Sequence, residues 1–159
     1  MTIVRDENGG FIFEDVEPQL VQLFLAIPRS TRPEDNPQVL DRLYPRPTET
    51  SEPELHEEWE QFVVPDLRET FEEATTVVEG DLKPLHGGAS GWVIPREHMD
   101  AWLNALNQAR LALAAKYAVT EEDMEVSAPY PVEDERGLAV AQIHVYGLLQ
   151  ECLIRYIEE

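Results

Sequence analysis

Residues 95–117, PREHMDAWLNALNQARLALAAKY, decide the fold class of this chain. Apolar side chains recur in this stretch on one side at helical spacing: Met99, Trp102, Leu103, Leu106, Leu113 and Tyr117. Pro95 suits the first position of a helix, because its ring fixes φ and the missing N–H would have no partner there. The stretch therefore predicts a long amphipathic helix that opens at Pro95.

An acidic stretch with the same periodicity precedes it. Between residues 51 and 78 one face carries apolar residues: Leu55, Trp59, Phe62, Val63, Leu67, Phe71, Ala74 and Val78. Glutamates, among them Glu54, Glu57 and Glu58, occupy the other faces. The pattern keeps its phase across Pro65, which cannot donate to the carbonyl four residues earlier. We expect one helical arm that is kinked or briefly interrupted near Pro65.

The last segment, residues 133–157, is apolar over most of a helical circumference. Its narrow polar sector consists of His144, Gly147, Glu151 and Arg155. Such a helix is either the central helix of a domain or part of a subunit interface. We favour the central helix, with a homo-oligomer through this helix as the alternative.

Short β-prone runs begin the chain. Residues 2–5 and 11–14 flank the turn sequence DENGG, which predicts an N-terminal β-hairpin over residues 1–14. Residues 82–85 and 92–94 flank the glycine-rich loop HGGASG at 86–91, and we expect a possible second short hairpin there. We interpret that loop as a tight turn.

Proline marks the connection between the hairpin and the arm. A first helix is expected from Val16 to Ile27, capped by Asp15 and ended by Pro28. Six of the twelve prolines then fall within residues 28–53. This segment reads as a Pro-rich connection with one short helix over residues 36–44.

Length and composition fit one domain over residues 1–159. The chain is 43% apolar, which is enough for one sizeable core. The expected fold is mainly α, a single-domain helical bundle. We expect a cytoplasmic protein, because the longest apolar stretches are interrupted before bilayer length and the single Cys152 cannot form an internal disulfide.

The net charge of the chain limits the classes of partner that it can bind. Thirty-two Asp and Glu oppose twelve Lys and Arg, a formal charge of -20. Nucleic acids and anionic membranes bind proteins through Lys and Arg, so we expect neither as a partner. The charge favours a protein partner with a basic surface, or it serves only solubility or salt adaptation.

Arg110 is the polar residue that needs an explanation, because it falls on the apolar face of the 95–117 helix. A buried guanidinium needs partners. One interpretation is a ligand pocket for a carboxylate or a peptide C-terminus, with Asn107 one turn before Arg110 and with His144. The other, which we favour as the commoner use, is an internal salt bridge to Glu69, Glu72 or Glu73.

Catalytic and metal motifs are absent from the sequence. His144 and Glu151 lie two turns apart, too far for a catalytic pair within one straight helix. We favour an interface histidine beside a Glu151–Arg155 surface ion pair. His56 and Glu60 have the i, i+4 spacing of two metal ligands, but one such pair is a weak signal. We expect no metal, no cofactor and no catalytic residues, and we lean against an enzyme.

Part of the chain resembles a known family. The residues that carry the resemblance are Trp102, Leu103, Leu106, Asn107, Arg110, Leu111, Leu113 and, further on, Thr120, Glu121 and Glu122. They resemble a bacterial family catalogued as a domain of unknown function. Ala114 stands where that family has a small Gly. The resemblance implies an acidic helical domain whose gene often neighbours that of ClpS, the substrate adaptor of the Clp protease.

Two functions follow as hypotheses. The first is an acidic protein-interaction or regulatory module, linked to Clp-dependent proteolysis, whose arm carries Glu54, Glu57 and Glu58 as a partner surface. The second is a small-ligand-binding protein or enzyme with a pocket around Arg110, Asn107 and His144. The second requires that these three side chains converge on one cavity.

Overall fold

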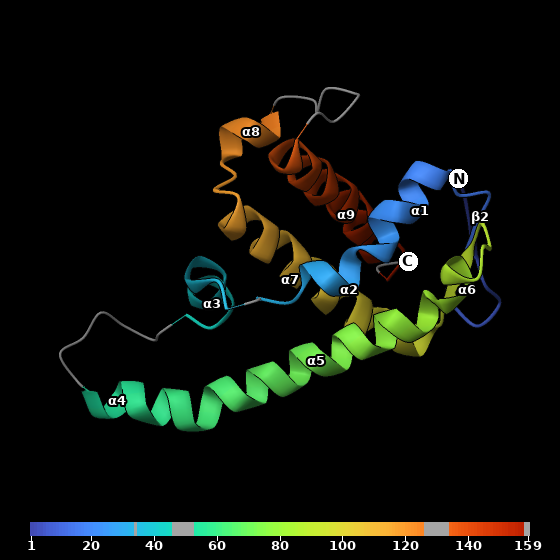
Figure 1. The fold of residues 1–159 in the computed structure, drawn as a ribbon. Helices are drawn as coiled ribbons and strands as arrows, with labels where there is room; N and C mark the ends of the chain where they lie inside the picture. Colours follow the sequence, from blue (N-terminus) through green and yellow to red (C-terminus); the bar gives the residue numbers. More distant parts are fainter. Residues whose placement is uncertain (34, 46–52, 126–133, 158–159) are drawn as a thin grey trace.

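Helix α7 (Met99–Lys116) lies at the centre of the structure and confirms the predicted amphipathic helix. A single 3-10 turn, Arg96–His98, precedes it. The helix packs against α9 (Glu135–Ile157) on one side and α5 (Val64–Asp81) on another, as Figure 1 shows. Its buried residues are Met99, Trp102, Ala105, Leu106, Gln108, Ala109, Ala112 and Leu113. The alanines let neighbouring helices approach closely.

The computed structural model describes residues 1–33, 35–45, 53–125 and 134–157. Over these residues the chain folds as helices around α7, with a small antiparallel sheet near the N-terminus. The expected mainly helical, single-domain fold class is confirmed.

The N-terminal hairpin forms as predicted. Strands β1 (Thr2–Arg5) and β2 (Phe11–Glu14) pair antiparallel, with Arg5 opposite Phe11. Gly9 closes the turn at φ 89°, a conformation that favours glycine. Because side chains alternate along a strand, Phe11 and Phe13 both face the core, each 1% exposed.

The second hairpin was predicted with the wrong partner. Residues 92–94 do form a strand, β3 (Trp92–Ile94), but it pairs with β2 and makes a three-stranded sheet. Residues 83–86 instead form a helical turn, α6 (Lys83–His86), with Pro84 in its first turn. The Trp92 and Phe13 rings stack at a centroid distance of 4.1 Å. The glycine-rich loop is the predicted tight turn, with the Ala89 N–H donating to the Pro84 carbonyl at 3.0 Å.

The first predicted helix is divided in two. Helix α1 (Pro18–Leu25) is followed by a single turn, α2 (Ile27–Ser30), which contains Pro28. Asp15 does not cap α1: the N-cap position belongs to Glu17, and Asp15 has φ 51°. Both the cap and the helix start were therefore predicted wrongly.

The short helix of the Pro-rich connection is α3 (Pro37–Leu43). The Asn36 side chain caps it by accepting hydrogen bonds from the N–H groups of Gln38 and Val39, at 3.0 and 3.2 Å. Val39 and Leu43 are buried with Ala112 of α7. This helix confirms the prediction for residues 36–44, and residues 46–52 of the connection lie outside the described part.

The predicted interruption near Pro65 takes the form of a π-helical turn. Helix α4 (Pro53–Glu58) runs into the turn η1 (Trp59–Val63), and α5 follows with Pro65 in its first turn. The Val64 N–H donates to the Trp59 carbonyl, a π-type hydrogen bond that spans five residues. The proline that lacks an N–H thus follows a stretch with altered hydrogen bonding.

Helix α9 forms close to the predicted residues 133–157, but its role differs from the prediction. The central helix is α7, and α9 packs on one side of it. Some α9 residues are fully buried, such as Tyr146 and Leu153, but Leu138 and Leu148 are 43% and 66% exposed. By length and composition α9 is the one helix among the described residues that could cross a bilayer, with 44% of that window buried in the fold. Self-association through α9 stays a prediction.

A buried hydroxyl joins α9 to α1. The Tyr146 hydroxyl donates to the Leu23 carbonyl and accepts from Nε2 of Gln142 at 3.1 Å. Gln142 also donates to the Ser30 hydroxyl at 3.3 Å. Burial raises the pKa of Tyr146 to about 12, because the phenolate would lose its hydration there, and the hydrogen bond from Gln142 opposes this only in part.

Replacing Tyr146 by Phe should lower the free energy of unfolding by about 1–2 kcal/mol at neutral pH, because the Leu23 carbonyl and the Gln142 amide lose a buried partner. An unfolded Tyr ionises near pH 10, whereas Tyr146 ionises near 12. Its contribution to stability is therefore present below pH 10 and lost as the pH rises towards 12. Urea unfolding at several alkaline pH values should show that the free energy of unfolding falls less with rising pH in Tyr146→Phe than in the wild type. The exposed Tyr156→Phe variant is the control, and identical pH profiles for both variants would contradict the assignment.

Candidate functional site

A cleft between α7 and α9 brings together the three residues proposed for a ligand pocket. Asn107 and Arg110 from α7 and His144 from α9 line the same cavity, of about 460 Å³. The remaining lining residues are Met124, Ile143, Gly147, Leu148, Gln150, Glu151 and Ile154. The geometric requirement of the ligand-pocket hypothesis is met.

The Arg110 guanidinium is held from α9 by a neutral side chain. Its Nη1 donates to Oε1 of Gln150 at 2.7 Å, and Nε2 of Gln150 donates to the Leu103 carbonyl at 3.4 Å. The Nε of Arg110 is buried and has no hydrogen-bond partner among the described residues. The group is thus fixed in place but keeps unused donor capacity.

The internal salt bridge that we favoured for Arg110 does not form. Within the described residues no ion pair of Arg110 occurs, and Glu69, Glu72 and Glu73 are exposed on α5. The reason is the orientation of α5, whose buried face consists of Ala74, Thr75 and Val78. Its acidic faces point to solvent, and α9 covers Arg110 instead.

Gly147 is the reason that the guanidinium can lie against α9. A Cβ added at this position would stand 3.3 Å from both Cζ and Nη2 of Arg110. That is tighter than an ordinary van der Waals contact, so any larger side chain would displace the guanidinium. The glycine in the polar sector of α9 is thereby explained by packing.

His144 is half-buried at the same cleft. Its Nε2 is buried without a hydrogen-bond partner in the described part of the chain. Glu151 also lines the cleft but forms no hydrogen bond with His144, as its spacing predicted. The expected Glu151–Arg155 ion pair is absent among the described residues, because both side chains are exposed and neither approaches the other within 4 Å.

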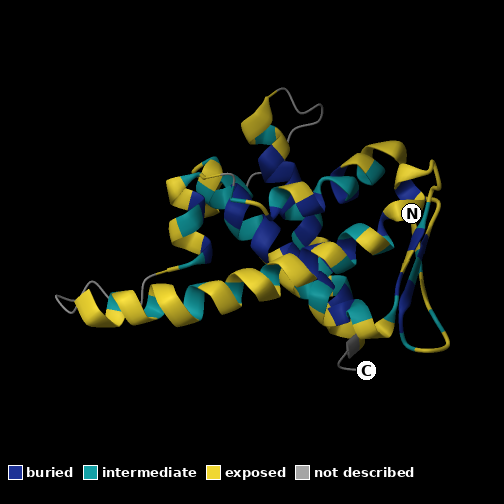
Figure 2. Cartoon of the chain, turned by 60° about the horizontal axis from the view of Figure 1, so that its bottom comes forward, coloured by how far each residue is buried: buried dark blue, intermediate teal, exposed yellow. Residues whose placement is uncertain are grey.

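The proposed partner-surface acids lie elsewhere. Glu54, Glu57 and Glu58 are exposed on α4, in a segment that projects from the body of the domain (Figure 1). From here on, the arm means only the projecting part of the predicted helix, residues 53–64, which comprises α4, η1 and the first residue of α5. Figure 2 shows the arm as largely exposed, whereas the buried residues concentrate around α7. The arm and the α7–α9 cleft are therefore two separate candidate surfaces.

Sequence reasoning missed a carboxylate–imidazole contact at the start of α7. Asp81, at the end of α5, accepts from Nε1 of Trp102 at 2.9 Å and contacts Nδ1 of His98 at 2.9 Å. The Asp81 side chain is 11% exposed and that of His98 is 38% exposed. The arrangement ties the end of α5 to the beginning of α7. Its one sequence signal was an aspartate at the end of an apolar stripe.

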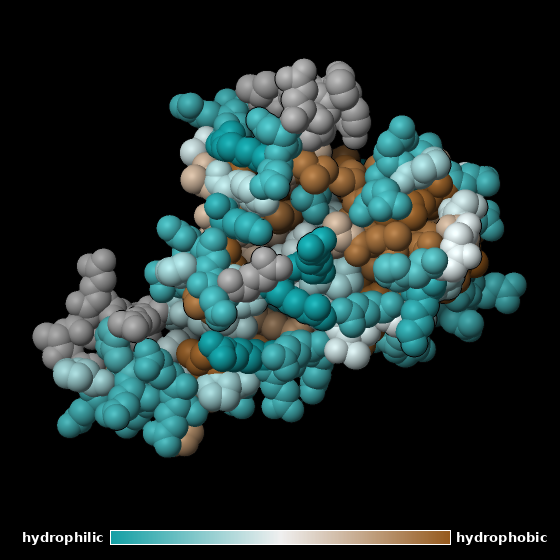
Figure 3. Space-filling model, in the orientation of Figure 1, coloured by the Kyte–Doolittle hydropathy of each residue, from teal (hydrophilic) through white to brown (hydrophobic). Residues whose placement is uncertain are grey.

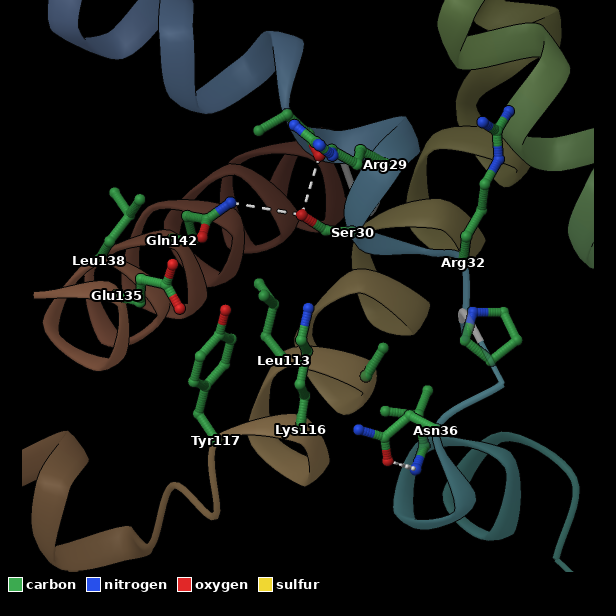
Figure 4. A pocket seen from close by; sticks show the side chains of 14 residues that line it. Arg29, Ser30, Arg32, Asn36, Leu113, Lys116, Tyr117, Glu135, Leu138 and Gln142 are labelled. Carbon is green, nitrogen blue, oxygen red and sulfur yellow. Dashed lines mark hydrogen bonds between the residues drawn. The ribbon is translucent and has the colours of Figure 1, made fainter.

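A second pocket, of about 430 Å³, was also missed. It lies between α2, α3, α7 and α9, and Arg29, Arg32 and Lys116 are among its lining residues (Figure 4). Figure 4 shows the Arg32 side chain directed towards α5, where it pairs with Glu79 at 2.7 Å. Arg29 and Arg32 are close neighbours in the sequence, but Lys116 comes from α7, so no local pattern indicates that the three cations line one pocket.

The described residues hold no group of three or more His, Cys, Asp or Glu side chains arranged to bind a metal ion. His56 and Glu60, with metal-ligand spacing, lie on the arm and are joined by no third ligand of this kind in that part of the structure.

Comparison with known proteins agrees with the resemblance carried by residues of α7. A family model described as Domain of unknown function (DUF2017) matches residues 7–157. No curated protein and no solved structure matches the chain. The match includes strands β2 and β3, the arm and the α7–α9 cleft, so both candidate surfaces are parts of the family's domain. The chain belongs to the DUF2017 family.

Proposed function

We propose that this protein is an interaction module that binds a protein partner through the arm. The observation that carries the proposal is the exposure of large apolar side chains on a projecting helix: Phe62 is 62% exposed and Leu55 is 46% exposed. The arm makes its main contacts along its own length, through η1 to α4 and α5. Exposed apolar residues on an element that leaves the body are typical of a binding surface.

Charge defines the kind of partner. Residues 53–64 contain four glutamates, Glu54, Glu57, Glu58 and Glu60, and neither Lys nor Arg. In the view of Figure 3 the arm surface is mainly hydrophilic, whereas apolar side chains gather over α9 and α1. We infer a partner with an apolar groove bordered by Lys and Arg, which would accept the Phe62 face and neutralise the glutamates. A second copy of the arm fits less well, because its glutamates would repel those of the first.

A place in regulated proteolysis is part of the proposal. This part rests on the family resemblance described in the sequence analysis, which implies that the gene often neighbours that of ClpS. An acidic arm of this kind would act by docking rather than by chemistry, and we expect it to do so in a bacterial cytoplasm. Nucleic acid stays an unfavourable partner for a chain with a formal charge of -20.

A comparative capture experiment tests the proposal. The tagged wild type, the arm variant Leu55→Ser/Phe62→Ser and the control Leu148→Ser are incubated with lysate of the source cell at low and high salt. Leu148 is a matched control because it is 66% exposed but lies on α9. We expect a stoichiometric protein that the wild type and Leu148→Ser retain at low salt, and that the arm variant loses. The same proteins bound to all three forms would refute binding through the arm.

A further inference from the structure

The charge of Arg110 has no carboxylate partner within the described structure, although the chain carries 32 acidic residues. Among the described residues, its hydrogen bond goes to a neutral amide oxygen, that of Gln150. Guanidinium groups removed from water are normally paired, because an unpaired cation loses hydration without compensation. In a chain with so many acidic residues, a carboxylate would be the simplest partner for Arg110, yet none pairs with it among the described residues. The cleft therefore contains a cation that a ligand can pair with.

The guanidinium is also held in one orientation. Gln150 binds it at one end and is itself bonded to the Leu103 carbonyl of α7. Gly147 lets its plane approach the α9 backbone. A donor group that is already fixed loses little conformational entropy when it binds an acceptor. This is the behaviour of a binding group rather than of a solvated surface arginine.

A second side chain with an unpartnered nitrogen lines the same cleft. His144 is half-buried there, and its Nε2, like Nε of Arg110, is enclosed by protein atoms without a hydrogen-bond partner among the described residues. Asn107 adds an exposed amide one turn from Arg110. A carboxylate has two oxygens with lone pairs, and a guanidinium and an imidazole N–H can each donate to it.

Part of the wall is apolar. Met124, Ile143, Leu148 and Ile154 line the cleft beside the polar groups. Leu148 and Ile154 are 66% and 45% exposed, so a ligand tail lying on them would remove apolar surface from water. A single fixed cation beside an aliphatic wall matches a molecule with one negative charge and an apolar tail.

We propose that the α7–α9 cleft binds a small aliphatic monocarboxylic acid, with its carboxylate on Arg110 and His144 and its tail along Leu148 and Ile154. A multiply charged anion such as phosphate fits less well. The cleft is lined by one arginine and also by Glu151, and the chain as a whole is strongly negative. This site is separate from the arm and does not depend on the partner proposed for it.

Nuclear magnetic resonance titration with hexanoate tests the site. The reporters are the Arg110 side-chain Nε–H and the backbone amide of Gly147, with hexanamide as the neutral analogue and inorganic phosphate as the multiply charged one, all at constant ionic strength. We expect saturable shifts of both reporters with hexanoate at millimolar concentration, and affinities for hexanamide and phosphate weaker by about tenfold or more.

Variants separate charge recognition from structure. Arg110→Gln should weaken hexanoate binding by about tenfold or more, because the charged donor is lost. Glu151→Gln should strengthen it several-fold by removing a competing negative charge, and it leaves every hydrogen bond of Arg110 in place. Arg155→Gln, an exposed arginine on the same helix outside the cleft lining, should bind like the wild type.

Four results would overturn the proposal. The first is the absence of saturable shifts with hexanoate in the wild type and in Glu151→Gln. The second is equal binding of hexanamide, which would reduce the site to an apolar groove. The third is equal binding of phosphate, which would make it a general anion site. The fourth is binding of N-acetyl-leucine far tighter than hexanoate, which would identify a peptide C-terminus as the ligand.

Discussion

Replacing Gly91 by Ala should cost roughly 3 kcal/mol or more of unfolding free energy, the largest stability effect expected of a single added methyl group in this domain. A Cβ at Gly91 would lie 2.1 Å from the carbonyl oxygen of Phe13 and 3.2 Å from the carbonyl carbon. Both atoms belong to the backbone, so no side chain can rotate away. The β2–β3 ladder must open, and the stacking of Trp92 on Phe13 must loosen with it.

The same substitution at Gly80 is the matched control. Gly80 lies in α5, and a Cβ there would meet nothing within 4 Å. Gly80→Ala should therefore raise the unfolding free energy by about 0.5–1 kcal/mol, because alanine favours the helix. Urea unfolding followed by tryptophan fluorescence measures both variants, since Trp92 and Trp102 lie in the core. A Gly91→Ala protein as stable as the wild type would show that β3 does not pack on β2 as described.

Reversing the charge of the arm should abolish partner binding. Changing Glu54, Glu57 and Glu58 to Lys turns three attractive contacts with a basic groove into repulsive ones, and we expect the affinity to fall by roughly 100-fold at low salt. The effect should shrink as salt is added, because the Debye length falls to about 8 Å at physiological ionic strength. The affinity for the purified partner is measured by titration calorimetry across a salt series.

Helix α8 (Glu121–Glu125) supplies the control for this reversal. Glu121, Glu122 and Glu125 are also exposed, and changing them to Lys alters the net charge of the chain by the same amount. Equal losses of affinity in the two triple variants would mean that the partner responds to overall charge and not to the arm. A loss confined to the arm variant is the expected result.

Local sequence signals were sufficient for most elements. The cap of α3 joins Asn36 to the N–H groups of the following residues, and before α8 the Thr120 N–H donates to Asp123 at 2.8 Å, so both contacts lie within a few positions of the chain. The hairpin at the N-terminus is equally local. Periodicity identified α7 because its buried positions follow one another at helical spacing.

Pairing between distant segments was harder to predict. Strand β3 joins β2 across about eighty residues, and three residues carry too little pattern to select a partner. The glycines that fit this ladder, Gly10 and Gly91, were visible in the sequence, but only the structure shows that each faces a carbonyl of the neighbouring strand. Apolar content also led us to predict α9, rather than α7, as the central helix. Alanine is only weakly apolar, yet the alanines of α7 allow its neighbours to pack closest.

The candidate cleft was predicted in its residues but not in its contacts. Arg110 stood out because it interrupts an apolar face, and the nearest acidic helix seemed to offer its partner. The actual partner, Gln150, is neutral and forty positions away, and no charge rule points to it. The acidic and apolar faces of the arm could be predicted from the periodicity of the sequence. Its projection from the body could not, because it depends on which part of α5 contacts α7.

Hydrogen–deuterium exchange of the wild-type protein, with and without the purified partner, tests binding through the arm most directly. A projecting helix whose hydrogen bonds face solvent should exchange quickly when free. We expect the partner to slow exchange of the amides of residues 53–64 and to leave those of α8 and α9 unchanged. Protection confined to α8, α9 or the sheet, with the arm exchanging as fast as in the free protein, would contradict the account.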